Sequence, residues 1–271
     1  MSTSERYVKF VAVAKKDGKY FMEKLKKLVK WKENASILDV GCGPGNVTHN
    51  FLLPALPKSA SLTAIDKAAD AIHYANEHYG NSSQVTFRQM DIVSPDPNFS
   101  QTFDHIFSFY CLHFIFEQEI ALRNIYKMLN FGGDFFFTCA VQCEIFQVIS
   151  NIFGVEKWAP YISDYKKHTS PYQHSKEPRY ELEQMLLRVG FEVSFLNSEP
   201  REHYYPINSA KDVVLSIHSI NIPEDLKEEF HMDVVKTVRD IGCSQIKGGE
   251  EFYRTKYQIL FGYATKPKPN L

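Results

Sequence analysis

The amino-acid sequence predicts an α/β protein built on a doubly wound, mostly parallel sheet. Short apolar segments that end in glycine or acidic residues alternate with segments of helical periodicity through the first half of the chain. Residues 36–40 (SILDV) are largely apolar and do not alternate with polar residues, as expected for a strand buried on both faces. Strands separated by helical segments of about 10–15 residues form βαβ units, which build parallel sheets with helices on both faces.

The expected elements follow one another along the whole chain. Seven strands are expected at residues 36–40, 61–65, 85–90, 103–109, 134–141, 191–196 and 252–264, the last of them a closing antiparallel strand. Helices are expected at residues 17–29, 46–53, 68–79, 117–129 and 179–189. Asp17 is the expected N-cap of the first helix, and Gly132 and Gly133 are expected to form a turn. Such sheets bind ligands at the carboxyl ends of their strands, so functional residues are sought directly after each strand.

Composition and charge exclude several classes of protein. The net charge of −1 and pI of about 6.8 leave no basic excess for a phosphate backbone, so no nucleic-acid partner is expected. The five cysteines show no paired spacing and no His/Cys cluster supplies four zinc ligands, so neither a disulfide framework nor a metal is expected. No apolar run reaches the length of a membrane span, and the N-terminus lacks the pattern of a signal peptide. We therefore expect a cytoplasmic protein.

The strongest motif is the glycine-rich segment at residues 38–46 (LDVGCGPGN), which follows the first strand. Glycines let the backbone approach a ligand closely, and the helix that follows offers free N–H groups. The dinucleotide fingerprint G-x-G-x-x-G would place its last glycine at position 46, where this chain has Asn46. The spacing G-x-G-x-G, preceded by Asp39, instead resembles motif I of class I S-adenosylmethionine-dependent methyltransferases. An NAD-dependent oxidoreductase is the alternative from another reaction class.

Two further acidic residues follow the next two strands. Asp66 ends the second strand, where a carboxylate can accept both ribose hydroxyls of an adenosine-type ligand. Asp91 and Ile92 follow the third strand, and the resemblance implies that they bind the adenine amino group and ring. Each aspartate alone is typical of a turn or a helix cap. Three acidic residues placed after three successive strands favour the cofactor interpretation.

The segment after the fourth strand, residues 107–114 (FSFYCLHF), lacks the Asn/Asp-Pro-Pro-aromatic tetrad of enzymes that methylate nucleic-acid bases. His113 in this segment could line a ligand site, act as a general base, or be a core histidine bonded to backbone. The absence of the tetrad agrees with the neutral charge balance.

Several strings resemble the insect juvenile hormone acid methyltransferases. They are Trp31-Lys32, ILDVGCGPGNVT, FDHIFSFYCLHF, FGGDFFF, EKWAPY and SPYQH, and they extend over nearly the whole chain. The glycine motif is general to class I methyltransferases, whereas residues 156–161 and 170–174 are much more specific. The resemblance implies a seven-stranded, Rossmann-like sheet and the methylation of a small apolar, farnesoid carboxylic acid with S-adenosyl-L-methionine.

The resemblance also implies a set of site residues. Cofactor-binding positions are Asp39, Gly41, Cys42, Gly43, Gly45, Asp66, Lys67, Asp91, Ile92, Ser108 and Phe109. His113 and Phe114 are the catalytic candidates, and Ala14, Phe114, Trp158, Tyr161 and Tyr172 are the substrate-binding candidates. The family pattern has Gln at position 14 and Trp at position 114, and both can donate a hydrogen bond to a carboxylate. Ala14 and Phe114 cannot, so a different donor or a different substrate is implied.

One domain over residues 1–271 is expected, with a helical segment at 1–32 and a cofactor-binding core at 33–141. The irregular, aromatic-rich segments 142–177 and 208–250 are expected to form a helical cap over the carboxyl ends of the strands, with plain surface helices as the alternative. A homodimer is the default oligomer. The functional alternatives are a paralogue that methylates another acid, an amine or a phenol, and a non-catalytic protein that binds the cofactor or a terpenoid.

Overall fold

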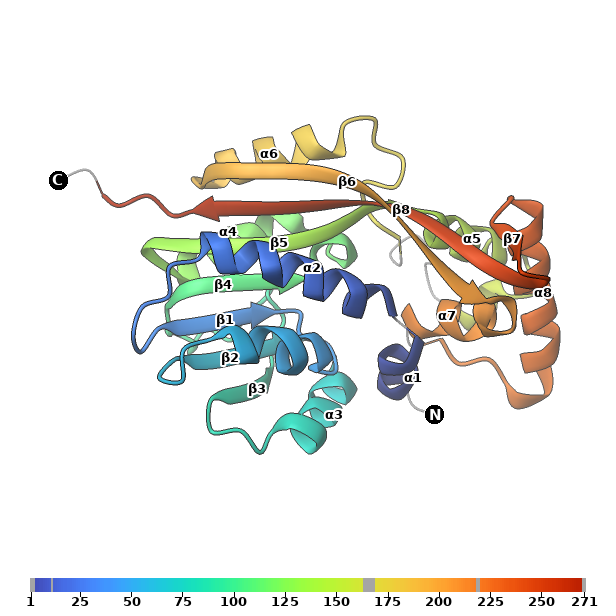
Figure 1. Ribbon diagram of the computed structural model, residues 1–271, viewed down its shortest axis with the longest axis horizontal. Coiled ribbons are helices and arrows are strands. Elements are labelled where there is room, and N and C mark those ends of the chain that lie inside the picture. Colours follow the sequence, from blue (N-terminus) through green and yellow to red (C-terminus); the bar gives the residue numbers. More distant parts are fainter. Residues whose placement is uncertain (1–2, 11, 163–168, 218–219, 270–271) are drawn as a thin grey trace. The chain divides into compact units, whose positions relative to one another are not determined.

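The computed structural model describes residues 3–10, 12–162, 169–217 and 220–269, and within these residues the chain forms one eight-stranded sheet (Figure 1). The strands are β1 (Ser36–Val40), β2 (Ser61–Asp66), β3 (Val85–Gln89), β4 (Phe103–Phe109), β5 (Leu129–Cys143), β6 (Glu192–Pro206), β7 (Ser244–Lys247) and β8 (Glu250–Thr265). Their order is β3-β2-β1-β4-β5-β8-β6, and β7 pairs with β8 outside this path.

The first five strands form a parallel sheet with β1 at its centre. β1 pairs in parallel with β2 and β4, β2 with β3, and β4 with β5. The register sets Val40 beside Ile65, so the carboxyl ends of β1 and β2 lie at the same edge. β8 runs in the opposite direction to β6 (Figure 1). The expected doubly wound, mostly parallel sheet is confirmed, and β7 is a strand that the sequence pattern did not predict.

The helices are α1 (Thr3–Phe10), α2 (Ala12–Leu28), α3 (Ala69–Tyr79), α4 (Gln118–Met128), α5 (Glu144–Phe153), α6 (Pro178–Val189), α7 (Ala210–Ile217) and α8 (Lys227–Asp240). The N-cap prediction for Asp17 was wrong, because α2 begins at Ala12 and Asp17 lies inside it. Asp17 is fully buried, and the hydroxyl of Tyr110 donates a hydrogen bond to its Oδ2. No helix within the described residues is long and apolar enough to cross a bilayer.

One other local prediction was also wrong. Gly132 and Gly133 lie inside β5, which begins at Leu129, and Gly132 takes a φ of +76° where the register with β4 shifts. A glycine can adopt this conformation without breaking the strand, so the pair forms an irregularity and no turn. The helix expected over residues 46–53 is present, although its form is irregular: helical residues 46–47 lead into a π-helical turn, Thr48–Leu52, and a 3-10 turn that contains Pro54. Proline lacks the N–H that a longer helix would need.

The described chain divides into two compact units. The core unit comprises Val13–Cys139, Lys176–Ser198 and Leu260–Leu271, and the accessory unit comprises Met1–Ala12, Ala140–Ser175 and Glu199–Ile259. In the core unit, a large part of the phenylalanine content is buried in the sheet: Phe103, Phe107, Phe135, Phe136 and Phe137 have no exposed surface. Helix α2 packs on this sheet through Phe21, whose ring lies 5.2 Å from that of Phe261.

The accessory unit has its own apolar centre. Helix α5 buries an apolar face and packs against α8. Trp158 is 1% exposed, packs edge-on against Phe230 at 5.0 Å, and donates a hydrogen bond from Nε1 to Asp233 Oδ2 at 2.9 Å. Arg6 of α1 lies 3.7 Å from Asp212 of α7, and these two helices also pack together. Residues 140–175 and 199–259 therefore form a packed unit together with α1.

Candidate active site

The glycine turn after β1 is shaped by backbone that only glycine adopts easily. Gly41, Gly43 and Gly45 have φ values of +74°, +53° and +80°. A Cβ on Gly41 would lie 2.1 Å from the Sγ of Cys111, so no larger residue fits there. Among the described residues, no atom other than those of Gly43 and its two chain neighbours lies within 4 Å of the place that a Cβ on Gly43 would occupy. The turn therefore packs closely on the segment after β4 and leaves open space over Gly43, where a ligand could approach the backbone.

Asp66 holds the glycine turn to the end of β2. Its Oδ2 accepts a hydrogen bond from the Gly43 N–H at 2.9 Å, and its Oδ1 accepts one from the Ala68 N–H at 2.9 Å. Burial raises the pKa of this carboxyl, and the two N–H donors partly oppose that rise. Because the residue is half-buried and each oxygen has a second lone pair, the carboxylate can still accept hydroxyl donors from a ligand.

Asp39, near the end of β1, is the most buried of the three acidic residues predicted to bind the cofactor. It is 1% exposed, and Thr48 donates a hydrogen bond from Oγ1 to its Oδ2 at 2.6 Å. Its other oxygen, Oδ1, has no hydrogen-bond partner within the described residues. Burial and the nearby Asp66 raise the pKa of Asp39 to about 7, against the Thr48 hydrogen bond that lowers it. A buried carboxylate with an unused oxygen is suited to a cationic ligand group.

The end of β3 provides a third position. Asp91 is half-buried, and its Oδ1 accepts a hydrogen bond from the Val93 N–H at 2.9 Å. Ile92 is 5% exposed, and its carbonyl accepts a hydrogen bond from Asn124 Nδ2 at 2.8 Å. The local turn and Asn124 thus fix the backbone here. The side chain of Lys67, after β2, is exposed.

Ser108 and Phe109 at the end of β4 are used mainly within the sheet. Ser108 is fully buried and donates a hydrogen bond from Oγ to the Val40 carbonyl at 3.0 Å. The ring of Phe109 stacks parallel to that of Phe107 at 6.1 Å. Burial raises the pKa of Cys111 to about 12 and that of Cys42 well above its usual value. Both thiols therefore stay protonated and are poor nucleophiles.

His113 and Phe114 lie in a 3-10 turn, Leu112–Phe114. Gln118 supports this turn by donating a hydrogen bond to the Leu112 carbonyl at 2.9 Å. His113 is 3% exposed, and burial lowers its pKa to about 3, so its imidazole is neutral at physiological pH. Its ring lies 4.1 Å from that of the half-buried Phe114 and perpendicular to that of Tyr110 at 6.1 Å.

The remaining predicted substrate residues lie elsewhere. Ala14 is in α2, among residues whose side chains lie outside the described part. Trp158, Tyr161 and Tyr172 belong to the accessory unit, where Trp158 and Tyr161 lie 6.0 Å apart, ring to ring, and Tyr172 is 4% exposed. Their contact with a substrate stays a prediction.

Sequence reasoning missed four residues that shape the site: Asp17, Thr48, Tyr110 and Cys111. Tyr110 and Cys111 follow β4 directly, so the rule that ligands bind after strands could have found them. Thr48 lies one turn beyond the glycine motif. The sequence carried no signal for Asp17, because its partner Tyr110 is 93 residues away.

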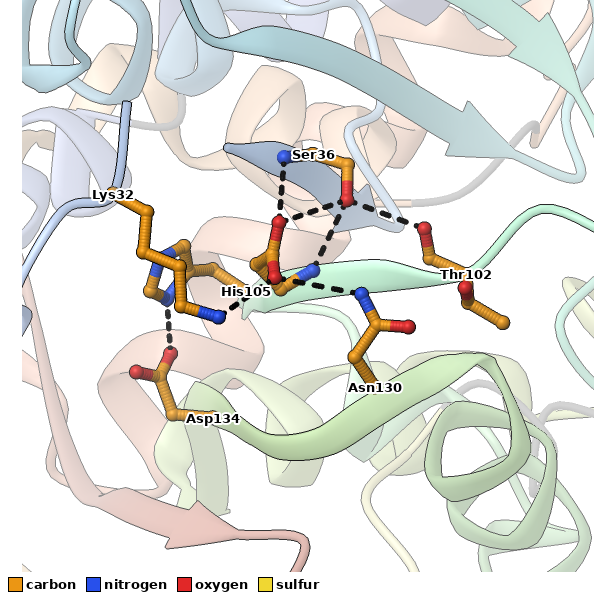
Figure 2. Close-up of polar contacts among 7 residues, drawn as sticks. Lys32, Ser36, Thr102, His105, Asn130 and Asp134 are labelled. Carbon is orange, nitrogen blue, oxygen red and sulfur yellow. Dashed lines mark hydrogen bonds and ion pairs between the residues drawn. The ribbon is translucent and has the colours of Figure 1, made fainter. Parts of the chain in front are cut away.

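A separate polar cluster lies at the other end of β4 (Figure 2). His105 Nδ1 lies 2.8 Å from Asp134 Oδ1, and both residues are buried. Asp104 binds Lys32 Nζ at 2.9 Å and the Ser36 N–H at 3.1 Å. These contacts join the start of β1 to β4 and β5, so they stabilise the sheet away from the glycine turn.

Comparison with known proteins identifies the family. A family model described as a methyltransferase domain matches residues 31–183, more than half of the chain. The chain is 30% identical to the juvenile hormone acid O-methyltransferase of Bombyx mori, over 98% of both chains. It is also 30% identical to that of Drosophila melanogaster, over 98% of this chain and 93% of the relative. The chain belongs to the juvenile hormone acid methyltransferase-like family of class I methyltransferases.

Solved structures show the same fold. A methyltransferase from Bacillus halodurans superposes with a TM-score of 0.60 at 18% identity, over 91% of this chain and 99% of that chain. Phosphoethanolamine N-methyltransferase 2 of Haemonchus contortus, solved in complex with S-adenosyl-L-methionine, superposes with a TM-score of 0.51 at 16% identity, over 90% of this chain and 51% of that chain. The protein is an S-adenosylmethionine-dependent methyltransferase.

The core unit of this methyltransferase fits its cofactor. The unused Oδ1 of Asp39 can accept a hydrogen bond from the ammonium of the methionine part. The open space over Gly43 leaves room for the cofactor to approach the protein backbone, and Asp66 is suited to the ribose hydroxyls. The hydrogen bonds that Asp66 accepts from Gly43 and Ala68 keep its carboxylate in place before a ligand arrives.

Proposed function

We propose that this methyltransferase esterifies the carboxylate of a small apolar acid of the farnesoid, juvenile hormone acid class. The observation that carries the proposal is the extent of the similarity to the two juvenile hormone acid O-methyltransferases, which covers 98% of this chain. It therefore includes residues 199–259 of the accessory unit, which lie beyond the general methyltransferase model that ends at residue 183. Similarity confined to the cofactor-binding residues would support the reaction type alone.

For this reaction the protein must align the cofactor with the substrate carboxylate and exclude water. When bound, S-adenosylmethionine supplies a methyl group that is attached to a positively charged sulfur. Transfer of this methyl group to a carboxylate oxygen leaves S-adenosylhomocysteine. A carboxylic acid is ionised at neutral pH, so no residue needs to remove a proton. His113 is neutral, because its pKa is about 3, and can offer an N–H to an anion without carrying a charge. The ring of Phe114 can exclude water, and its face can stabilise the positively charged sulfur by a cation–π contact.

The same histidine argues against an amine or phenol acceptor. Such a substrate must lose a proton, and His113 would be the base in this segment. A base whose conjugate acid has a pKa of about 3 takes up a proton poorly at pH 7. A carboxylate acceptor avoids this requirement, which supports the proposal.

A different small acid is the second candidate, and the two departures from the family pattern favour it. Ala14 and Phe114 stand where the family has Gln and Trp, so two hydrogen-bond donors to a carboxylate are missing. An anion left without donors in a buried site is costly, so a refitted pocket would be expected to select another acid.

The test is methyl transfer from radiolabelled S-adenosylmethionine to a panel of acids. The panel contains farnesoic acid, juvenile hormone acid, shorter fatty acids and aromatic acids, and product is extracted into organic solvent and treated with mild base. Base-labile label on a farnesoid acid is the expected result. Label only on other acids supports the second candidate. Label on none of the acids, with cofactor binding intact, refutes carboxyl methylation.

A further inference from the structure

Tyr110, the first residue after β4, has a strained backbone. Its φ is +54°, in the left-handed region that a bulky side chain rarely adopts. Such strain persists only where surrounding contacts impose it, and it is often found at functional sites. The neighbouring residues Cys111 and His113 both belong to the active-site segment, so the backbone of Tyr110 sets how this segment leaves the sheet.

Two contacts hold Tyr110 in this conformation. Its backbone N–H donates a hydrogen bond to Thr138 Oγ1 of β5 at 3.1 Å. Its hydroxyl donates a hydrogen bond to Oδ2 of Asp17, which is fully buried in α2. Hydrogen bonds to a buried carboxylate are among the stronger ones in proteins. The N-terminal helix α2 is thus fastened to the segment that follows β4 by one side-chain pair, 93 residues apart in the sequence.

The next residue connects the same segment to the glycine turn. Cys111 packs so closely on Gly41 that a Cβ on this glycine would lie 2.1 Å from Sγ and 2.4 Å from the Cβ of Cys111. Gly41 in turn donates a hydrogen bond from its N–H to the Ile65 carbonyl at 2.8 Å. A shift of Cys111 would therefore displace Gly41 and the turn that faces the cofactor.

We propose that Tyr110 is a positioning residue that couples the docking of helix α2 to the cofactor-binding glycine turn, through Asp17 on one side and Cys111 on the other. Close packing transmits displacement between contacting groups, because a dense interior has no free space to absorb it. Coupling of this kind is reciprocal. Cofactor binding stabilises the docked α2, and docking of α2 raises the affinity for the cofactor.

The experiment uses the full chain and S-adenosylhomocysteine as the probe, so it needs no acid substrate and does not depend on the proposed function. Tyr110→Phe removes only the hydroxyl, and Cys111→Ala breaks the second link. Asp17→Asn keeps an acceptor oxygen for Tyr110. Tyr263→Phe is the matched control, because the Tyr263 hydroxyl donates to Asp134 Oδ2 at 3.0 Å at the other end of β4.

The readouts are calorimetric affinity and hydrogen exchange of residues 13–28 with and without the probe. In the wild-type chain and in the Tyr263→Phe control, the probe should slow exchange in these residues. Tyr110→Phe and Cys111→Ala should lose this protection and bind the probe about ten-fold more weakly, whereas Asp17→Asn should keep most of both.

The proposal is overturned if the probe protects residues 13–28 equally in Tyr110→Phe and the wild type, or if Tyr263→Phe loses protection to the same extent. An affinity change of less than about two-fold in Tyr110→Phe also overturns it. Should Tyr110→Phe fail to fold, the same two readouts on Cys111→Ala decide the question.

Discussion

Asp39 is the side chain through which pH should act on cofactor affinity. Burial and the neighbouring Asp66 raise its pKa to about 7 in the free protein, and its Oδ1 has no partner within the described residues. The ammonium of the cofactor would favour the ionised carboxylate, so binding should require Asp39 to lose its proton. The perturbation is Asp39→Asn, which keeps the shape and the hydrogen bond from Thr48 while removing the titration.

The expected magnitude follows from the fraction of ionised Asp39. With a pKa of about 7, roughly 10% of the free protein is ionised at about pH 6 and roughly 90% at about pH 8. Because apparent affinity scales with this fraction, the wild-type affinity should rise about ten-fold over this interval. Binding at the lower pH should release close to one proton.

The assay is calorimetric titration with S-adenosylhomocysteine in pairs of buffers that differ in ionisation enthalpy. Asp39→Asn should bind more weakly, and its affinity should not change between the two pH values. A wild-type affinity independent of pH would refute the reasoning, as would an Asp39→Asn variant that keeps the ten-fold rise.

Stability of the free protein should depend on Asp39 in the opposite sense. The pKa of Asp39 in the folded protein, about 7, lies above the ordinary value of 3.8. The contribution of protonated Asp39 to the free energy of unfolding is therefore fully present below pH 3.8 and is lost as pH rises through 7. The difference corresponds to about 4 kcal/mol, so Asp39→Asn should stabilise the free protein by a few kcal/mol at about pH 8 and much less at about pH 5. Urea denaturation at the two pH values measures this.

Three further outcomes concern the sheet and the turn. Gly41→Ala should abolish binding of S-adenosylhomocysteine in calorimetry and lower the melting temperature. Adding Cys111→Ala to this variant removes the clash but should restore neither the binding nor the melting temperature fully, because the φ of +74° at residue 41 remains. Asp134→Ala should cost about 2–4 kcal/mol in urea denaturation, since it leaves the buried His105 and the half-buried Tyr263 hydroxyl without their acceptor, and should leave transfer activity intact; a cost below about 1 kcal/mol would contradict this. Burial tends to raise the pKa of Asp104, but Lys32 and Ser36 outweigh it and lower the pKa to about 2. The stabilisation that ionised Asp104 provides should therefore disappear as pH falls from 3.8 through 2. Acid denaturation of Asp104→Asn should lack the loss of stability that the wild type shows over this interval.

The sheet was predictable because the pattern of apolar residues that marks each strand lies within a short segment of the chain. Residues 36–40 and 103–109 were predicted with the bounds that β1 and β4 have. The glycine motif was equally local, and its three positive φ values are what its spacing requires. Local patterns therefore predicted the scaffold and the glycine turn.

The errors arose where distant contacts override local preference. Asp17 has the sequence signature of an N-cap, yet a buried bond to Tyr110 makes it an interior residue of α2. Gly132 suggests a turn, yet pairing with β4 carries the strand through it. The left-handed backbone of Tyr110 could not be predicted, because no local rule places tyrosine there. Two of the residues on which the coupling proposal rests, Asp17 and Tyr110, thus owe their conformation and burial to tertiary contacts.

The charges of the core unit also predict the order in which ligands bind, if the substrate is an acid. At about pH 8, where roughly 90% of Asp39 is ionised, this carboxylate brings negative charge to the cofactor site, and the buried His113 brings no positive charge because its pKa is about 3. A carboxylate entering first would meet repulsion, whereas the ammonium of a bound cofactor neutralises Asp39. Farnesoic acid should therefore bind in calorimetry only when S-adenosylhomocysteine is already present. Equal affinity with and without it would show that another cationic or donor group holds the acid independently of the cofactor.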